Sequence, residues 1–487
     1  MQRYESIRSA AQVAPSERQL AWQELEFYAF IHFTVNTFTD REWGTGDEDP
    51  AVFDPAELNA DQWVEAVKSA GMRGLILTCK HHDGFCLWPS RFTTHTVASS
   101  PWRNGAGDLV KEVADACRRG GIKFGVYLSP WDRHEPSYGD SPAYNAFFKN
   151  QLRELLTNYG ELFCVWFDGA CGEGPNGKRQ VYDWDGYYAL IRELQPGAVI
   201  SVCGPDVRWC GNEAGHTRAS EWSVVPAHLQ DNEKIQERSQ QSDDREFAKR
   251  IDTQDADLGS RGVIAGYDRL IWYPAEVNTS IRPGWFYHAS EDDQVKPLEE
   301  LLRVYYGSVG GNASFLLNVP PDPRGLVHER DAERLKQLGD ALRGAFRANA
   351  AAGAEARASE AADAAHEANR ATDGDRGTFW RPREGTERAW IEIDLPKAAT
   401  FDCVVLMEHI RSGQRIERFS LEYRDGVEWR ELYRGTVVGY KRICRFEPVA
   451  ARSIRLTIEE SRWCPTLSAF EVYDHSEGGS SSWRHSK

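Results

Sequence analysis

The chain has 487 residues, 41% of them hydrophobic, which is enough to bury the cores of two or more domains. It carries 58 basic and 74 acidic side chains, a formal net charge of −16. A surface of that sign repels phosphate backbones and anionic lipids, so neither nucleic acid nor a membrane is expected as a partner.

The first residues, MQRYESIRSAAQVAPSERQLAW, contain no apolar stretch of the kind that a secretion signal needs. Nowhere does an apolar run approach the length of a membrane-spanning helix. Ten cysteines are scattered without a close Cys-x-x-Cys pair, which favours buried free thiols in a reducing compartment. We therefore expect a cytoplasmic protein.

Between residues 27 and 345, apolar runs typical of strands alternate with segments of helical periodicity. The expected strands are 27–33, 73–80, 122–129, 161–167, 198–203, 269–277 and 313–319. The expected helices are 60–71, 107–121, 146–160, 186–197, 298–310 and about 328–346. Repeated strand–helix units with near-continuous apolar strands indicate a parallel sheet. About seven or eight strands favour a TIM-like barrel over residues 1–346. An open doubly wound sheet is the alternative, although no Gly-x-Gly-x-x-Gly follows the first strand.

The pattern changes after residue 346. Residues 347–369 are rich in alanine and are expected to form a linker or a short helix. Short stretches with a period of two then recur through residues 370–475, which predicts a β-sandwich. The Gly- and Ser-rich end, 476–487, is expected to be disordered. The predicted fold class is thus α/β, a TIM-like (β/α) barrel followed by a C-terminal all-β sandwich.

Candidate reactive groups stand at the carboxyl ends of the predicted barrel strands, where TIM-barrel enzymes place their active sites. In ELFCVWFDGACGEG an apolar run ends at Asp168. An Asp-Gly pair is also an ordinary turn, but its place at a strand end favours a catalytic carboxylate. The other strand ends and the loops after them add His32, Glu42, Trp43, His81, His82, Tyr127, Trp209, Glu213, Glu276, Arg282 and Trp285. Carboxylates, neutral histidines and aromatic rings together suit a polyhydroxylated ligand.

A glycosidase needs two carboxyl groups beside one scissile bond. Asp168, short and at the end of a rigid strand, suits the nucleophile. Glu213 lies in a loop near Trp209 and apolar neighbours, where partial desolvation would raise its pKa and keep the acid protonated. Glu221 and Glu276 are the alternative acids.

Seven segments in order resemble family 29 of the glycoside hydrolases, the α-L-fucosidases, over about residues 20 to 345. They are FIHFTVNTF, CKHHDGFCLW, GVYLSPWD, VWFDGA, RWCGNEAG, SIRPGWFYH and LLNVPPDPRGL. The resemblance implies a retaining exo-α-L-fucosidase that removes terminal L-fucose from oligosaccharides or glycoconjugates through a covalent fucosyl-enzyme, without a cofactor. It implies that Asp168 is the nucleophile and that Glu213 is the general acid/base of the branch preferring α-1,3/1,4 linkages. By the same resemblance, fucose is held by His32, Glu42, Trp43, His81, His82 and Tyr127, with Arg282 and Trp285 near the pocket.

The C-terminal region resembles a discoidin-like module of the coagulation factor 5/8 type C family. The supporting residues are ATDGDRGTFWRP, 371–382, and AFEVYD, 469–474. The resemblance implies a structural calcium ion held by Asp373, Thr378 and Glu471. The module then either binds sugar or packs on the barrel.

Two other functions remain open on the sequence. One is a carbohydrate-binding protein that has lost catalysis. The other is a metal-dependent hydrolase with zinc held by His32, His81 and His82, although adjacent residues at a strand end point in opposite directions.

Overall fold

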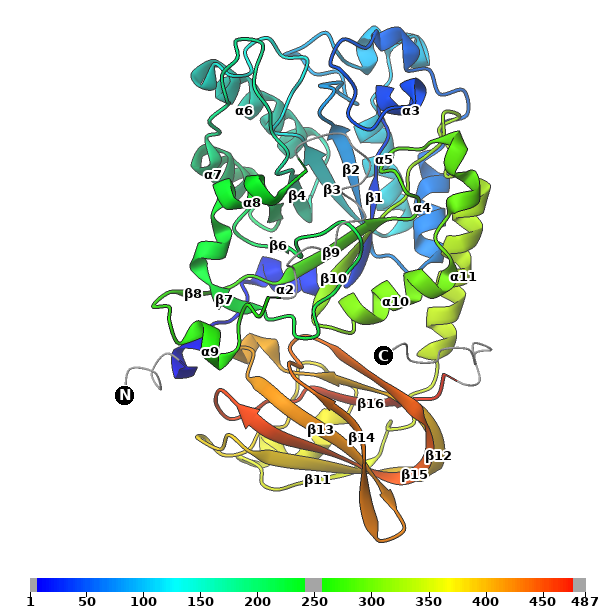
Figure 1. The fold of residues 1–487 in the computed structure, drawn as a ribbon. Coiled ribbons are helices and arrows are strands. Elements are labelled where there is room, and N and C mark those ends of the chain that lie inside the picture. The colour runs from blue at the N-terminus through cyan, green and yellow to red at the C-terminus, as the bar shows by residue number, and fades with distance from the viewer. Residues whose placement is uncertain (1–6, 241–255, 476–487) are drawn as a thin grey trace.

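The computed structural model describes residues 7–240 and 256–475. The expected disorder of residues 476–487 lies outside the described residues. Eight strands in the described part form one parallel sheet in the order β5-β4-β3-β2-β1-β10-β9-β6 (Figure 1). A parallel bridge between Ser201 and Val207 joins the β5 and β6 ends, so the sheet is a nearly closed barrel, as predicted. The strands are β1 (Phe27–Ile31), β2 (Gly74–Lys80), β3 (Lys123–Leu128), β4 (Cys164–Phe167), β5 (Val199–Val202), β6 (Arg208–Trp209), β9 (Ala275–Ser280) and β10 (Ala313–Asn318).

Helices surround this barrel and bury their apolar sides against it (Figure 1). One of them, α5, shows how the sequence sets the ends. Asp108 caps its first turn by accepting from Lys111 N at 2.9 Å, and Gly121 ends it with a φ of +68°. The helices are α2 (Glu17–Gln23), α3 (Val35–Thr39), α4 (Ala60–Ser69), α5 (Leu109–Gly120), α6 (Ser141–Asn158), α7 (Trp184–Leu194), α8 (Asn232–Arg238), α9 (Arg261–Ile264), α10 (Leu298–Ser308) and α11 (Glu329–Ala345).

The single strand expected at 269–277 is two strands. Strand β8 (Leu270–Trp272) pairs antiparallel with β7 (Val224–Pro226) outside the barrel, and the chain joins the barrel only at β9. Pro274 separates the two, because proline has no N–H to donate to a central ladder.

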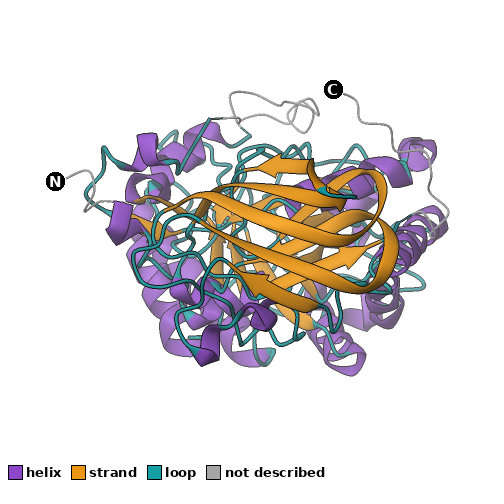
Figure 2. Cartoon of the chain, turned by 90° about the horizontal axis from the view of Figure 1, so that it is seen from below, coloured by secondary structure: helices purple, strands orange, loops and turns teal. Residues whose placement is uncertain are grey.

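The C-terminal region is an antiparallel all-β module, as predicted. Its strands are β11 (Glu355–Ala358), β12 (Ala389–Met407), β13 (Ile416–Asp425), β14 (Glu428–Gly435), β15 (Arg442–Ser461) and β16 (Ala469–Tyr473). The long strands β12 and β15 pair along most of their length, with two register shifts. Side chains from both halves of β12, such as Ile391 and Leu406, share one apolar cluster, so the sheet folds over its own core (Figure 2).

Residues 347–369 are not simply a linker or a short helix. Glu355–Ala358 form strand β11, which pairs with Ile391–Asp394 of β12. The alanine content misleads because small side chains also fit a sheet edge that packs against a core. Ala356 and Ala358 are partly buried against that core.

All ten cysteines are free, and nine of them are buried, as the sequence predicts. Within the described ranges, no helix combines the length and the apolar character needed to cross a bilayer.

Candidate active site

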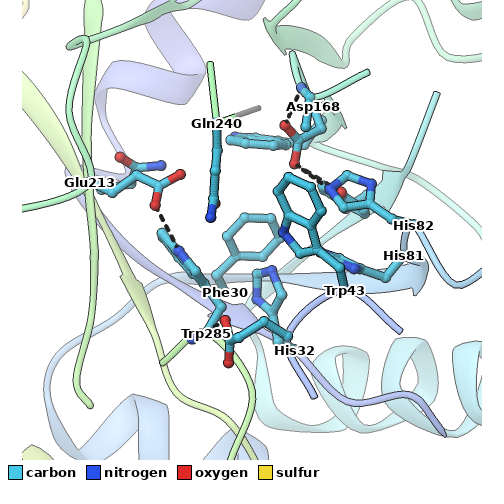
Figure 3. A pocket seen from close by; sticks show the side chains of 14 residues that line it. Phe30, His32, Trp43, His81, His82, Asp168, Glu213, Gln240 and Trp285 are labelled. Carbon is cyan, nitrogen blue, oxygen red and sulfur yellow. Dashed lines mark hydrogen bonds and ion pairs between the residues drawn. The ribbon is translucent and has the colours of Figure 1, made fainter. Parts of the chain in front are cut away.

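A pocket opens where the carboxyl ends of the barrel strands meet. Asp168 and Glu213 face it from opposite sides (Figure 3). Its walls are Phe30, His32, Glu42, Trp43, His81, His82, Tyr127, Trp166, Asp168, Ala170, Glu213, Gln240, Asn278 and Trp285. The pocket therefore joins side chains from β1, β3, β4 and β9 with side chains from the loops that follow the strands, among them the loop after β2.

The Asp168 carboxylate is held in one orientation. Its Oδ1 accepts from Ala170 N at 2.9 Å, and its Oδ2 accepts from Tyr127 OH at 3.0 Å. Asp168 directly follows the rigid strand β4, and in an aspartate only one rotatable bond lies between the backbone and the carboxyl carbon. The group is thus aimed with little freedom to move.

Glu213 stands in a tight turn between β6 and β7. Gly211 and Gly215, with φ of +103° and +69°, flank it and permit the turn. Its Oε2 accepts from Trp285 Nε1 at 2.9 Å. Burial raises the pKa of Glu213 to about 8, and the nearby charge of Asp168 also raises it, whereas the indole N–H lowers it. At pH 7, about ten molecules therefore carry a protonated Glu213 for each one in which it is ionised. At the ordinary pKa of 4.5, only about one molecule in 300 would carry the protonated acid.

The three histidines are neutral at pH 7, because burial lowers the pKa of His32 and of His82 to about 4 and that of His81 well below its usual value. Ser129 donates its hydroxyl to Trp131 O at 2.6 Å, so it accepts from His82 Nδ1 at 2.7 Å. We assign the proton of His82 to Nδ1, which leaves Nε2 as an acceptor 3.8 Å from Asp168 Oδ2.

The tautomer of His32 is fixed in the same way, by a hydrogen-bond acceptor at Nδ1. Asn318 donates its amide to Ser280 Oγ and Trp285 O, so its Oδ1 accepts from His32 Nδ1 at 2.8 Å. The Nε2 of His32 is again left as an acceptor.

Glu42 anchors the loop after β9. It accepts from Trp285 N at 2.9 Å, Phe286 N at 3.1 Å and His288 Nε2 at 2.8 Å. These bonds fix the backbone of Trp285, whose indole side chain reaches Glu213. Glu42 therefore both lines the pocket and positions one of its walls.

Three predicted binding residues do not line the pocket. Trp209 donates to Asn278 Oδ1 at 3.1 Å. Glu276 is enclosed in the barrel, where Tyr28 OH and Trp166 Nε1 donate to it at 2.5 and 2.8 Å. Arg282 is fully buried and pairs with Asp331 at 2.8 Å and Asp292 at 2.9 Å.

The alternative acids do not line the pocket either. Glu221 pairs with Arg208 at 2.6 Å and Arg218 at 3.2 Å, away from the pocket walls, and Glu276 is enclosed as described. The lining residues that sequence reasoning missed are Phe30, Trp166, Ala170, Gln240 and Asn278. Of these, only Asn278 gave a usable signal, as a polar residue in the second half of a buried strand.

The histidines do not form a metal centre. Over the residues described, no group of three or more His, Cys, Asp or Glu side chains is placed to hold a metal ion. The Nδ1 atoms of His32 and His82 are both engaged by protein partners. The metal-dependent hydrolase is therefore not favoured.

The residues proposed for calcium do not fit that ion well. Thr378 donates to Asp373 Oδ2 at 2.7 Å, and the Arg370 guanidinium lies 3.6 Å from the same carboxylate. Glu471 accepts from Tyr473 OH at 2.9 Å. Asp373 thus already has a hydrogen-bond donor and a cation beside it, in place of the oxygen ligands that calcium needs.

Hydrolysis of a glycosidic bond is the chemistry that uses two carboxyl groups on either side of a sugar, one of them kept protonated. By fold and by site the chain is a glycoside hydrolase. The sequence model of the α-L-fucosidase family matches residues 8–344, and that of the F5/8 type C domain matches residues 355–471. The chain belongs to the α-L-fucosidases, glycoside hydrolase family 29, and its substrates are fucosylated glycans.

Several known proteins resemble it along almost its whole length. Alpha-L-fucosidase 1 of Arabidopsis thaliana is 43% identical over 474 residues, which cover 96% of this chain and 88% of the relative. A family 29 fucosidase from Ruminococcus gnavus, solved in complex with fucose, superposes with a TM-score of 0.82 at 32% identity and 95% coverage of both chains. A family 29 member from an unknown rumen bacterium gives a TM-score of 0.76 at 40% identity, covering 95% of this chain and 78% of the other.

Proposed function

We propose that the chain is a retaining exo-α-L-fucosidase in which Asp168 is the nucleophile and Glu213 the general acid/base. The observation that carries this proposal is that the two carboxyl groups face one pocket from opposite sides (Figure 3). Asp168 attacks C1 of fucose while Glu213 protonates the departing glycosidic oxygen, and a covalent fucosyl-enzyme forms. Water then attacks C1, and Glu213 takes its proton. This chemistry needs no cofactor.

The surroundings of Glu213 support its first role. Trp285 Nε1 donates to Oε2, so the acid proton resides on Oε1. A pKa of about 8 keeps that proton in place at neutral pH.

The same surroundings support its second role. The charge of Asp168 contributes to the raised pKa of Glu213. When Asp168 becomes an ester in the intermediate, that charge is gone and the pKa of Glu213 falls. The group that has just given its proton away is then better able to stay ionised and to act as the base for water.

The pocket walls support fucose as the bound sugar. His32 Nε2 and His82 Nε2 offer acceptors for ring hydroxyls, and His81 Nδ1 is buried without a hydrogen-bond partner among the described residues. A sugar hydroxyl would satisfy that atom. The rings of Phe30 and Trp166 offer apolar faces to the C6 methyl group and the C–H face of the sugar.

We propose a preference for α-1,3/1,4-linked fucose. The two segments that resemble this branch are those around Glu213 and Trp285, and their side chains meet in a hydrogen bond. Release of fucose from a panel of α-1,2-, α-1,3-, α-1,4- and α-1,6-linked oligosaccharides tests the preference. Faster hydrolysis of the α-1,2 or α-1,6 linkage would contradict it.

Two variants test the assignment of roles. Asp168→Ala is expected to lose at least about 10³-fold in kcat while keeping its thermal stability. Glu213→Ala is expected to hydrolyse an activated aryl fucoside slowly and to be rescued by azide, which attacks the fucosyl-enzyme in place of water and yields α-fucosyl azide. Wild-type turnover by the Asp168 variant, or azide rescue that fails for Glu213, would reject the assignment.

A further inference from the structure

The segment that carries Glu213, residues 210–223, is called here the acid loop. At its start it follows β6, which pairs with Ala275 and Glu276 of β9, and Cys210 N donates to Glu276 O at 2.9 Å. Asn212 then shapes the turn, because its Oδ1 accepts from Ala214 N at 3.1 Å and its Nδ2 donates to His216 O at 3.2 Å. The barrel holds this first part of the loop, and Arg208 of β6 also reaches the second part, where it pairs with Glu221 at 2.6 Å and donates to Trp222 O at 3.1 Å.

The second part of the acid loop is also held by the C-terminal module. Gln414, which is fully buried, accepts through Oε1 from Ser223 N at 2.9 Å and from Val224 N at 3.3 Å. Arg442 Nη2 donates to Ala219 O at 3.0 Å. The hydroxyls of Thr436 and Ser220 share a further hydrogen bond.

More contacts of the module reinforce this part of the loop. The Arg462 guanidinium, fully buried, lies 4.4 Å from the centre of the Trp222 ring. Asn312, between α10 and β10, donates to Glu221 O at 2.8 Å and accepts from Tyr440 N of the module at 2.7 Å.

The two parts of the loop are connected by an internal ion pair. Glu221 pairs with Arg218, whose Nη1 also donates to Cys210 O at 3.0 Å. A displacement of residues 219–223 would therefore be transmitted through Arg218 to Cys210, three residues from Glu213. Loops carry catalytic groups accurately only when other parts of the structure support them.

We propose that the C-terminal module is part of the catalytic apparatus, with Gln414, Thr436 and Arg442 as positioning residues that hold the acid loop so that Glu213 faces Asp168. This inference rests on the proposed role of Glu213 as the general acid/base. It assigns the module a function in the reaction itself, in addition to any binding of glycans.

The test separates proton transfer from nucleophilic attack. Gln414→Leu removes the acceptor from two backbone N–H groups, and Thr436→Val removes one hydroxyl at nearly constant shape. Thr436→Ser restores that hydroxyl. Arg411→Ala is the matched control, because Arg411 lies in the same module and pairs with Glu17 of α2, outside the acid loop.

Each full-length variant is assayed for kcat/KM with phenyl α-L-fucoside, whose leaving group needs a proton, and with 2,4-dinitrophenyl α-L-fucoside, whose leaving group does not. Gln414→Leu is expected to lose about 10- to 100-fold on the phenyl substrate and at most about twofold on the dinitrophenyl substrate. Thr436→Val is expected to show the same selectivity to a smaller degree, while Thr436→Ser and Arg411→Ala resemble the wild type.

A second readout is the alkaline limb of the pH profile. A looser acid loop admits water to Glu213, so the contribution of burial to its raised pKa shrinks and the limb moves below about 8. Asp168, Glu42 and Trp285, the other groups that act on this pKa, are unchanged in these variants.

Equal losses on both substrates, or no loss in either Gln414→Leu or Thr436→Val, would overturn the inference. If Gln414→Leu does not fold, as judged by its melting temperature, the Thr436 pair still decides the question. Glu213→Gln in the same assay identifies the other kind of failure. If that variant shows no difference between the two substrates, the role of Glu213 is wrong, whatever the module variants do.

Discussion

Replacing Trp285 by phenylalanine removes one N–H donor from Glu213 and keeps an aromatic ring in the pocket wall. The indole Nε1 lies 2.9 Å from Glu213 Oε2, and the backbone at this position stays held by Glu42 and Asn318. The donor favours the ionised carboxylate, so it lowers a pKa that burial raises to about 8. A hydrogen bond to a charged acceptor is worth about 1.5–3 kcal/mol and one pKa unit about 1.4 kcal/mol, so the pKa of Glu213 should rise by about one to two units.

The assay is the pH dependence of kcat/KM, which reports the ionisation of essential groups in the free enzyme. Because the acid acts only when protonated, activity declines as pH rises past its pKa, and this decline should move upward from about pH 8 in Trp285→Phe. Trp209→Phe is the control, since its Nε1 donates to Asn278 and not to Glu213. An alkaline limb that stays in place or moves to lower pH in Trp285→Phe would refute the reasoning.

Three further outcomes are expected. Ser129→Ala removes the acceptor that fixes the His82 tautomer, and kcat/KM should drop about tenfold, the equivalent of one hydrogen bond, at an unchanged melting temperature; an unaffected kcat/KM would contradict the tautomer assignment. Glu276→Leu leaves the buried donors of Tyr28 and Trp166 without an acceptor. The free energy of unfolding measured in urea should therefore fall by about 2–6 kcal/mol, and an unchanged value would contradict the placement of this carboxyl inside the barrel. Arg282→Met leaves Asp331 buried without its partner and should cost about 3–5 kcal/mol of stability at an unchanged KM; a stable variant with a raised KM would return Arg282 to the substrate pocket.

The elements that the sequence predicts best are those whose burial is uniform. Strands such as β2 and β10 are buried along nearly their whole length and read as apolar runs. Strand β6 has only two residues, too few for a period. Strand β9 contains Glu276 and Asn278, because these side chains face the barrel interior and the pocket. For these reasons the sequence pattern does not predict β6, and it predicts the start of β9 only as the end of a single strand at 269–277.

The residues of the site also differ in how well the sequence predicts them. Strand ends identify Asp168, His32, His81 and His82, because the position of the backbone alone brings them to the rim. Nearness in sequence does not give the direction of a side chain, and so Arg282 points to α11 instead of into the pocket that Trp285 lines. Phe30 and Trp166 look like core residues in the sequence, and only the assembled barrel shows that their rings face the pocket.

The contribution of the C-terminal module to the acid loop had no signal in the sequence at all. Gln414 and Ser223 are 191 residues apart and meet only because the two domains pack together. Contacts of this kind depend on the tertiary arrangement and carry no local periodicity.

In the proposed mechanism Asp168 forms a covalent bond to the sugar, and trapping that bond is a direct test of its role. A fucosyl fluoride with fluorine at C2 slows breakdown of the intermediate more than its formation, so the labelled enzyme can be digested and its peptides sequenced by mass spectrometry. We expect one 2-fluorofucosyl label, on Asp168, and release of α-L-fucose as the first product from natural substrates. A label on another carboxyl group, or β-L-fucose as the first product, would contradict it.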